Sequence, residues 1–99
     1  MNNCKIRFSV LTYNIRIGKG LDGVLNLERT ADVLRESKAQ LIGLQEVDRF
    51  SERSGNVDQS RWLAQSLSMS QRYFPAFTTP FTYGNAILSQ FPILEDDSF

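Results

Sequence analysis

Two short apolar runs on either side of an amphipathic helix most constrain what this chain can fold into. Residues 6–15 (IRFSVLTYNI) begin with alternating polar and apolar side chains and become nearly continuously apolar, which is typical of a strand that becomes buried on both faces. Residues 41–47 (LIGLQEV) form a second run of this kind. Between them, residues 27–34 repeat apolar side chains at helical spacing, and Asn26 is placed to cap the helix. This order predicts a β-α-β unit with two parallel strands and a right-handed crossover.

The remainder of the chain continues the alternation of helix and strand. A second helix is expected from a cap at Asn56 to about Ser68, and its inner face carries Ser60, Leu63, Ala64 and Leu67. Most of the aromatic residues follow in the stretch 73–99, where residues 86–89 (AILS) form the clearest strand. The predicted fold class is therefore α/β with the order β-α-β-α-β-β, and 99 residues form one domain at most.

Composition excludes several kinds of site. The chain contains no histidine, so it cannot itself supply a Ser-His-Asp triad, a histidine-ligated zinc or a histidine base. Its one cysteine, Cys4, excludes an internal disulfide, and we expect a reducing, cytoplasmic location. Eleven basic and eleven acidic residues balance, which argues against strong non-specific DNA binding. We expect no membrane span, because no apolar stretch approaches about 18 residues, and no secretion signal, because residues 1–7 carry charge.

Two polar residues stand where the two predicted parallel strands end. Asn14 and Glu46 each follow an otherwise apolar run. Neighbouring strands lie about 4.8 Å apart, and open α/β sheets place their sites beyond the carboxyl ends of the strands. A carboxylate and an amide suit a hard cation such as Mg²⁺. We therefore expect Glu46 to bind a metal directly and Asn14 to orient a phosphate or a metal-bound water.

The residues alone leave other interpretations open. An asparagine that ends a strand also makes turns, and an acidic residue there also faces solvent or pairs with arginine. Asp48 and Arg49 fit either an ion pair or a supporting role beside the site. Residues 18–20 (GKG) match no phosphate-binding pattern and predict a turn, and residues 83–85 (YGN) fit either a pocket wall or a turn.

Three motifs taken together resemble those of the endonuclease/exonuclease/phosphatase superfamily, the metal-dependent phosphoesterases that include DNase I-like nucleases and inositol phosphatases. They are residues 11–15 (LTYNI), 43–48 (GLQEVD) and 83–93 (YGNAILSQFPI), in the order and spacing of the superfamily. The resemblance extends over residues 6–94, and the segment 57–59 (VDQ) also looks familial. It is specific for the superfamily and not for a substrate.

The resemblance implies roles for individual residues. Glu46 matches the metal-binding glutamate of the Q-E motif, and Asn14 matches the asparagine that ends the first strand and supports the metal and phosphate site. Asn85 matches a catalytic-site residue in the segment that flanks the active-site cleft. Many relatives have a histidine where this chain has Arg16, a departure that bears on contacts to phosphate or metal.

Two further segments of the superfamily, G-D-F-N and a terminal S-D-H, are absent from this sequence. In relatives they supply residues near the scissile phosphate and the Asp–His pair that activates water. The resemblance thus implies that residues 1–99 are a single incomplete domain, the N-terminal half of a four-layer α/β/β/α sandwich of the DNase I type. We expect the chain alone to be inactive or nearly so, and to self-associate through its uncovered sheet.

Two functional hypotheses follow. In the first, the chain is the N-terminal portion of a phosphoesterase that uses Mg²⁺ or Mn²⁺ to hydrolyse phosphodiester or phosphomonoester bonds. In the second, it is a non-catalytic remnant that binds a phosphate ligand or a partner chain. Three ordered motifs argue against a third alternative, a small autonomous domain with a coincidental resemblance. The substrate stays open among nucleic acid, phospholipid head group and inositol phosphate.

Overall fold

The computed structural model describes residues 9–93 of the chain, and the prediction for Cys4 lies outside them. The order of the main elements is β-α-β-α-β-β, as the sequence predicts. The strands and helices are β1 (Val10–Asn14), α1 (Leu27–Ser37), β2 (Leu41–Arg49), α2 (Gln59–Leu67), β3 (Ser70–Phe77) and β4 (Thr82–Ser89), with short 3-10 turns η1 (Arg16–Gly18) and η2 (Glu52–Ser54).

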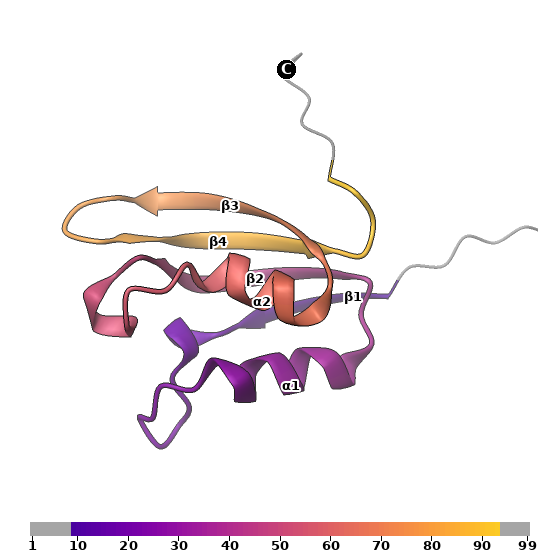
Figure 1. Cartoon of the computed structure of the whole chain (residues 1–99), viewed down its shortest axis with the longest axis horizontal. Helices are drawn as coiled ribbons and strands as arrows, with labels where there is room; N and C mark the ends of the chain where they lie inside the picture. Colours follow the sequence, from indigo (N-terminus) through magenta and orange to yellow (C-terminus); the bar gives the residue numbers. More distant parts are fainter. Residues whose placement is uncertain (1–8, 94–99) are drawn as a thin grey trace, which may run out of the picture.

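The four strands form one sheet in the order β1-β2-β4-β3 (Figure 1). β1 and β2 are parallel, so the predicted β-α-β pairing is confirmed. β4 runs antiparallel to both of its neighbours, β2 and β3. The connections after β1, β2 and β3 therefore all emerge at one end of the sheet, on the left of Figure 1. That end is where the candidate site lies.

Local chemistry explains where the two helices begin. The Asn26 side chain caps α1 by accepting a hydrogen bond from the Arg29 backbone N–H at 3.1 Å. α2 is capped by Asp58, so the predicted cap at Asn56 was wrong. Asn56 instead has a left-handed backbone (φ 58°) and donates its N–H to the carbonyl of Ser51 at 2.9 Å. Because a helix cap needs an extended backbone, Asn56 cannot close that turn and cap the helix at the same time.

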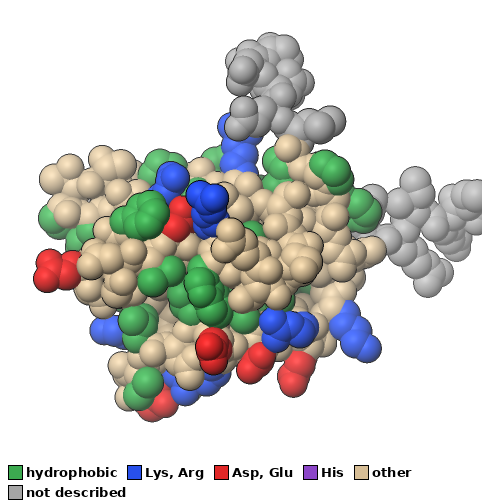
Figure 2. All heavy atoms as spheres, in the orientation of Figure 1, with side chains coloured by type: hydrophobic (Ala, Val, Ile, Leu, Met, Phe, Trp, Pro, Cys, Tyr) green, Lys and Arg blue, Asp and Glu red, His purple; other side chains and the backbone are tan. Residues whose placement is uncertain are grey.

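Both helices cover the same face of the sheet. Leu34 of α1 and Leu63 of α2 belong to one buried cluster with alternate residues of β2 and β4. Figure 2 shows the side on which α2 lies in front of the sheet, with hydrophobic side chains near the middle and charged side chains around them. Burying one such side chain contributes about 1.5–3 kcal/mol. The largest apolar side chains that are fully buried are Leu34, Ile42, Leu44, Leu63, Leu88 and Val47.

No helix of the described chain lies on the other face of the sheet, and apolar side chains remain exposed there. Val10 is 63% exposed, Phe74 43%, Ile87 39% and Leu41 36%. We call these four residues the open sheet face. The architecture is thus two layers of α and β with one side of the sheet uncovered, as expected of half of a sandwich. No helix within residues 9–93 is long and apolar enough to cross a membrane.

Candidate metal and phosphate site

Asn14 and Glu46 meet where β1 ends, as the sequence predicted, although β2 continues past Glu46 to Arg49. Asn14 is the last residue of β1 and pairs with Gln45 of β2. The parallel pairing continues one residue further, where the Ile15 N–H donates to the Gln45 carbonyl at 3.1 Å. This register brings the two side chains together, and the Asn14 amide Nδ2 donates a hydrogen bond to the Glu46 carboxylate Oε2. Their roles toward a metal stay a prediction.

A β-bulge aims Glu46 at Asn14. The pairing of β2 with β4 shifts between Leu44 and Val47, so that Gln45 and Glu46 together lie opposite Asn85. Glu46 has a left-handed backbone (φ 55°), which is uncommon for a residue with a side chain. Such a conformation costs about 1–3 kcal/mol and persists only where the surrounding structure imposes it. The bulge therefore turns the carboxylate away from the regular alternation of the strand.

The backbone turns sharply directly after Asn14. Its side-chain Oδ1 accepts the backbone N–H of Arg16 at 2.9 Å, and both Arg16 and Ile17 have a left-handed backbone (φ 51° and 52°). Asn14 therefore makes the strand-ending turn that one interpretation of the sequence proposed, and it contacts Glu46 as well. A single amide fixes both the carboxylate and the turn that carries Arg16.

A buried glutamine connects the two chain segments that carry the site. Gln59, the first residue of α2, is fully buried. Its Oε1 accepts the backbone N–H of Asp48 at 2.9 Å, and its Nε2 donates to the carbonyl of Ile17 at 2.7 Å. Sequence reasoning gave Gln59 no role. The available signal was that Gln59, a polar residue, lies at helical spacing on the inner face of α2. Arg61, two residues later, lies on the exposed face.

Asp48, two residues after Glu46, is fully buried in an ion pair with Arg53. Arg53 donates from Nε at 2.8 Å and from a terminal nitrogen at 2.6 Å, and the hydroxyl of Ser54 donates to the same carboxylate at 2.8 Å. The hydrogen bonds from Arg53 to Asp48 raise the pKa of Arg53 further above its ordinary value. Asp48 therefore forms an ion pair, although with Arg53 instead of its neighbour Arg49.

The guanidinium of Arg53 also lies over the β3–β4 hairpin. It sits 3.7 Å from the ring centroid of Phe81 and 5.3 Å from that of Tyr83. Phe77 stacks on Tyr83 with the ring centroids 5.2 Å apart. Arg53 thus attaches this aromatic hairpin end to β2, close to the bulge that carries Glu46.

A pocket of about 320 Å³ opens beside Glu46 between these parts. Its polar lining includes Arg16, Lys19, Glu46 and Arg53, and its aromatic wall includes Phe81 and Tyr83. Burial, followed by the charge of Glu46, raises the pKa of the Tyr83 hydroxyl. A neutral Tyr83 and three cations therefore line the same cavity as the carboxylate.

Asn85 lies further from the pair. Its neighbours Gly84 and Ala86 are buried on the helix side, so the exposed Asn85 lies on the opposite face of the sheet, as Asn14 does. β2 separates β1 from β4, and the Asn85 side chain makes no hydrogen bond within residues 9–93. The structure brings Asn85 to the same face as Asn14 but one strand away from it.

The donor set is small and rich in oxygen. In the part of the chain that the structure describes, no three His, Cys, Asp or Glu side chains gather into a metal-binding cluster. Glu46 is the one acidic residue among those that line its pocket there. This arrangement fits Mg²⁺ or Mn²⁺, because such an ion keeps several waters and is commonly held by only one or two carboxylates.

Comparison with known families places the chain among phosphoesterase-like folds. The family model of the PGAP2IP C-terminal nuclease-like domain matches residues 5–99. The chain belongs to this family. A solved structure of an endonuclease/exonuclease/phosphatase from Beutenbergia cavernae DSM 12333 matches 90% of the chain described here, with a TM-score of 0.68 and 24% sequence identity. The match covers 27% of that bacterial chain, and the likeness establishes the endonuclease/exonuclease/phosphatase fold.

Proposed function

We propose that this nuclease-like chain provides the metal- and phosphate-holding part of a divalent-metal-dependent phosphoesterase. One observation carries the proposal: a strained bulge within β2 turns the Glu46 carboxylate onto the Asn14 amide at the carboxyl end of the parallel strand β1. Sites in open α/β sheets form beyond such strand ends. The cations Arg16 and Lys19 line the same pocket and favour an anionic substrate.

Each residue has a distinct role in this proposal. Glu46 binds Mg²⁺ or Mn²⁺ directly, and Asn14 holds the carboxylate in place while its turn presents Arg16. Asn85 flanks the cleft from β4. When bound, the ion polarises the phosphoryl oxygens and stabilises the leaving oxygen. Since the sequence contains no histidine, the chain's own contribution is to bind and orient the phosphate ester rather than to supply a histidine base.

Metal binding tests the proposal directly. Titration of Mn²⁺, followed by electron paramagnetic resonance of the free ion, should show one site that Glu46→Gln weakens at least about tenfold. Asn14→Ala should weaken it by about 10–100-fold through loss of the orienting amide. Glu36→Gln, which removes an exposed carboxylate from α1, is the matched control and should leave the affinity unchanged. Equal Mn²⁺ affinity of the wild type and Glu46→Gln would contradict the proposal.

The open sheet face favours a second candidate function, a non-catalytic module that binds a partner chain. Val10, Leu41, Phe74 and Ile87 leave an apolar surface exposed on this face, and exposed apolar surface of this kind commonly marks an interface. The two candidates make different predictions for hydrolysis of bis(p-nitrophenyl) phosphate in Mn²⁺. If the chain is part of an enzyme, it should hydrolyse this ester, either alone or when it is joined to its partner chain. Glu46→Gln should then abolish the turnover. A binding module gives none.

A further inference from the structure

The pocket beside Glu46 contains two cations that the protein does not use for its own stability. Arg16 and Lys19 are both exposed, and neither forms an ion pair within the residues that the structure describes. The remaining arginines near this end are engaged: Arg29 with Asp22, Arg49 with Asp58 and Arg53 with Asp48. Of the three cations among the described residues that line this pocket, Arg16 and Lys19 therefore have their charge available for a ligand.

The positions of these cations are set by the fold. Arg16 lies directly after Asn14, whose amide closes the turn, and the Ile17 carbonyl is held by buried Gln59. Lys19 follows η1, where its backbone N–H donates to the Arg16 carbonyl at 3.0 Å. The short turn thus brings both residues to the lining of the pocket that Glu46, Phe81 and Tyr83 also line.

We propose that this pocket binds a second phosphate group of the substrate, held by Arg16 and Lys19 while the scissile phosphate lies at Glu46 and Asn14. This inference rests on the proposed function and adds a substrate class to it. The substrate is a small phosphate ester with at least two phosphates, either free or as a lipid head group. Hydrogen bonds from cationic side chains to phosphate oxygens are among the strongest that a protein surface offers.

Size and charge favour a small bisphosphate over a nucleic acid. A volume of about 320 Å³ lies at the lower end of the range for small-ligand pockets, about 300–1,000 Å³. Nucleic-acid binding depends on many phosphate contacts along a basic track, whereas this chain has a formal net charge of +0. Among the described residues that line the pocket, the cations without an ion pair are Arg16 and Lys19, which share one turn.

Isothermal titration without metal and with EDTA tests the second-phosphate site alone. The probes are inositol bisphosphate, inositol monophosphate and a short DNA duplex at the same salt concentration. We expect the wild type to bind the bisphosphate at least about fivefold more tightly than the monophosphate, since a cation–phosphate hydrogen bond contributes about that factor even when it is exposed. Vesicles of phosphatidylcholine with and without phosphatidylinositol bisphosphate distinguish a lipid head group from a free ligand.

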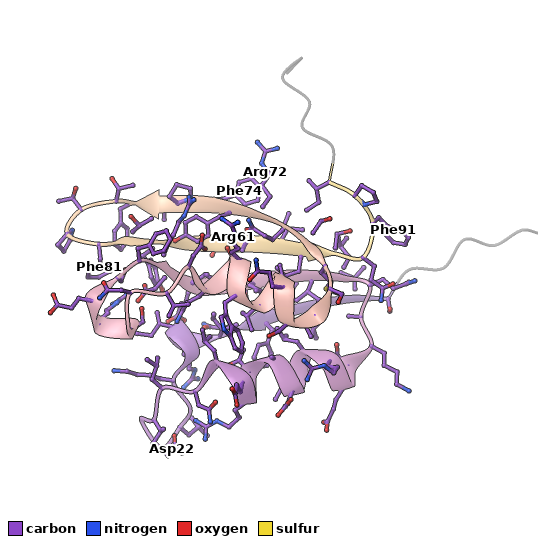
Figure 3. All side chains as sticks on the ribbon, viewed as in Figure 1. Asp22, Arg61, Arg72, Phe74, Phe81 and Phe91 are labelled. Carbon is purple, nitrogen blue, oxygen red and sulfur yellow. The ribbon has the colours of Figure 1, made fainter. Side chains whose placement is uncertain are left out.

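Four variants locate the site. Arg16→Gln and Lys19→Gln should each remove the preference for the bisphosphate while leaving Mn²⁺ binding in place. Arg61→Gln and Lys38→Gln remove the same charges elsewhere and should leave the preference unchanged; Arg61 lies on α2, away from the end of the sheet where Phe81 lies (Figure 3). Lys19 has an ordinary extended backbone (φ −91°), so its variant retains the fold even where Arg16→Gln does not.

The outcomes separate this inference from the proposed function. Unchanged bisphosphate preference in Lys19→Gln, equal affinity of the wild type for both inositol phosphates, or tighter binding of the DNA duplex would overturn the second-phosphate site. Glu46→Gln should lose Mn²⁺ binding and keep the bisphosphate preference. A wild type that shows this preference but binds no Mn²⁺ would overturn the metal proposal and leave the phosphate pocket standing.

Discussion

Replacing Arg53 with methionine should destabilise the fold far more than the same replacement at Arg35. Arg53 donates two hydrogen bonds, at 2.8 and 2.6 Å, to a carboxylate of Asp48 whose side chain has 0% exposure. Without Arg53, that buried charge keeps one side-chain donor, the Ser54 hydroxyl at 2.8 Å. Removing one partner of a buried pair costs about 3–5 kcal/mol, and the methionine leaves the apolar stacking on Phe81 partly in place.

Arg35→Met is the matched control. Arg35 pairs with Asp32 at 2.8 Å, but the two side chains are 53% and 70% exposed, so the pair is worth only about 0–1 kcal/mol. In urea unfolding followed by circular dichroism, the midpoint of Arg53→Met should lie about 1–3 M below that of the wild type, at the m-value of a domain this size. The Arg35 variant should shift it little. Equal midpoints for the two variants would refute the assignment of Asp48 as a buried charge that depends on Arg53.

Four further predictions test the framework around the site. Gln59→Leu should destabilise the chain by about 1–3 kcal/mol and speed amide exchange in residues 16–20, because the buried Asp48 N–H and the partly buried Ile17 carbonyl lose their partner. Gly84→Ala should lower the melting temperature strongly, since its Cβ would collide with the β3 backbone, whereas Gly43→Ala, with its nearest neighbour 3.7 Å away, should be tolerated. Burial raises the pKa of Tyr73 to about 12, so the unfolded chain ionises first and stability should fall as pH rises from about 10 to 12; Tyr73→Phe should reduce that slope in alkaline unfolding titrations. Ile87→Lys on the open sheet face should reduce self-association in sedimentation experiments, and an unchanged sedimentation profile would count against an interface there.

The parts of the fold that local chemistry dictates could be predicted from the sequence. Asn26 caps α1 as expected, since its backbone has no competing turn to close. The β-α-β unit followed from two apolar runs and one helical repeat, and parallel pairing then placed Asn14 beside Gln45 of β2, the residue before Glu46. Because side-by-side parallel strands bring their polar residues to the same region of a sheet, the sequence could predict that Asn14 and Glu46 lie near each other.

The parts that depend on several segments at once could not be predicted. Asn56 and Asp58 are both good helix caps, and only the tight turn that Asn56 closes assigns the cap to Asp58. The partner of Asp48 is likewise set by η2, which folds Arg53 back over the strand instead of leaving neighbouring Arg49 as the partner. In both cases local sequence offers two equivalent residues, and the tertiary turn selects one.

The direction of Glu46 depends on parts of the chain that are remote in sequence. A regular β2 would alternate its side chains and lack the one-residue shift against β4 that turns the carboxylate to Asn14. The strained backbone of Glu46 therefore requires β4, and Asp48 is fixed by α2 through Gln59. The β-α-β unit alone supplies both residues of the candidate site but not their geometry. It follows that the last strands and the second helix are as necessary for the site as the motif that carries the glutamate.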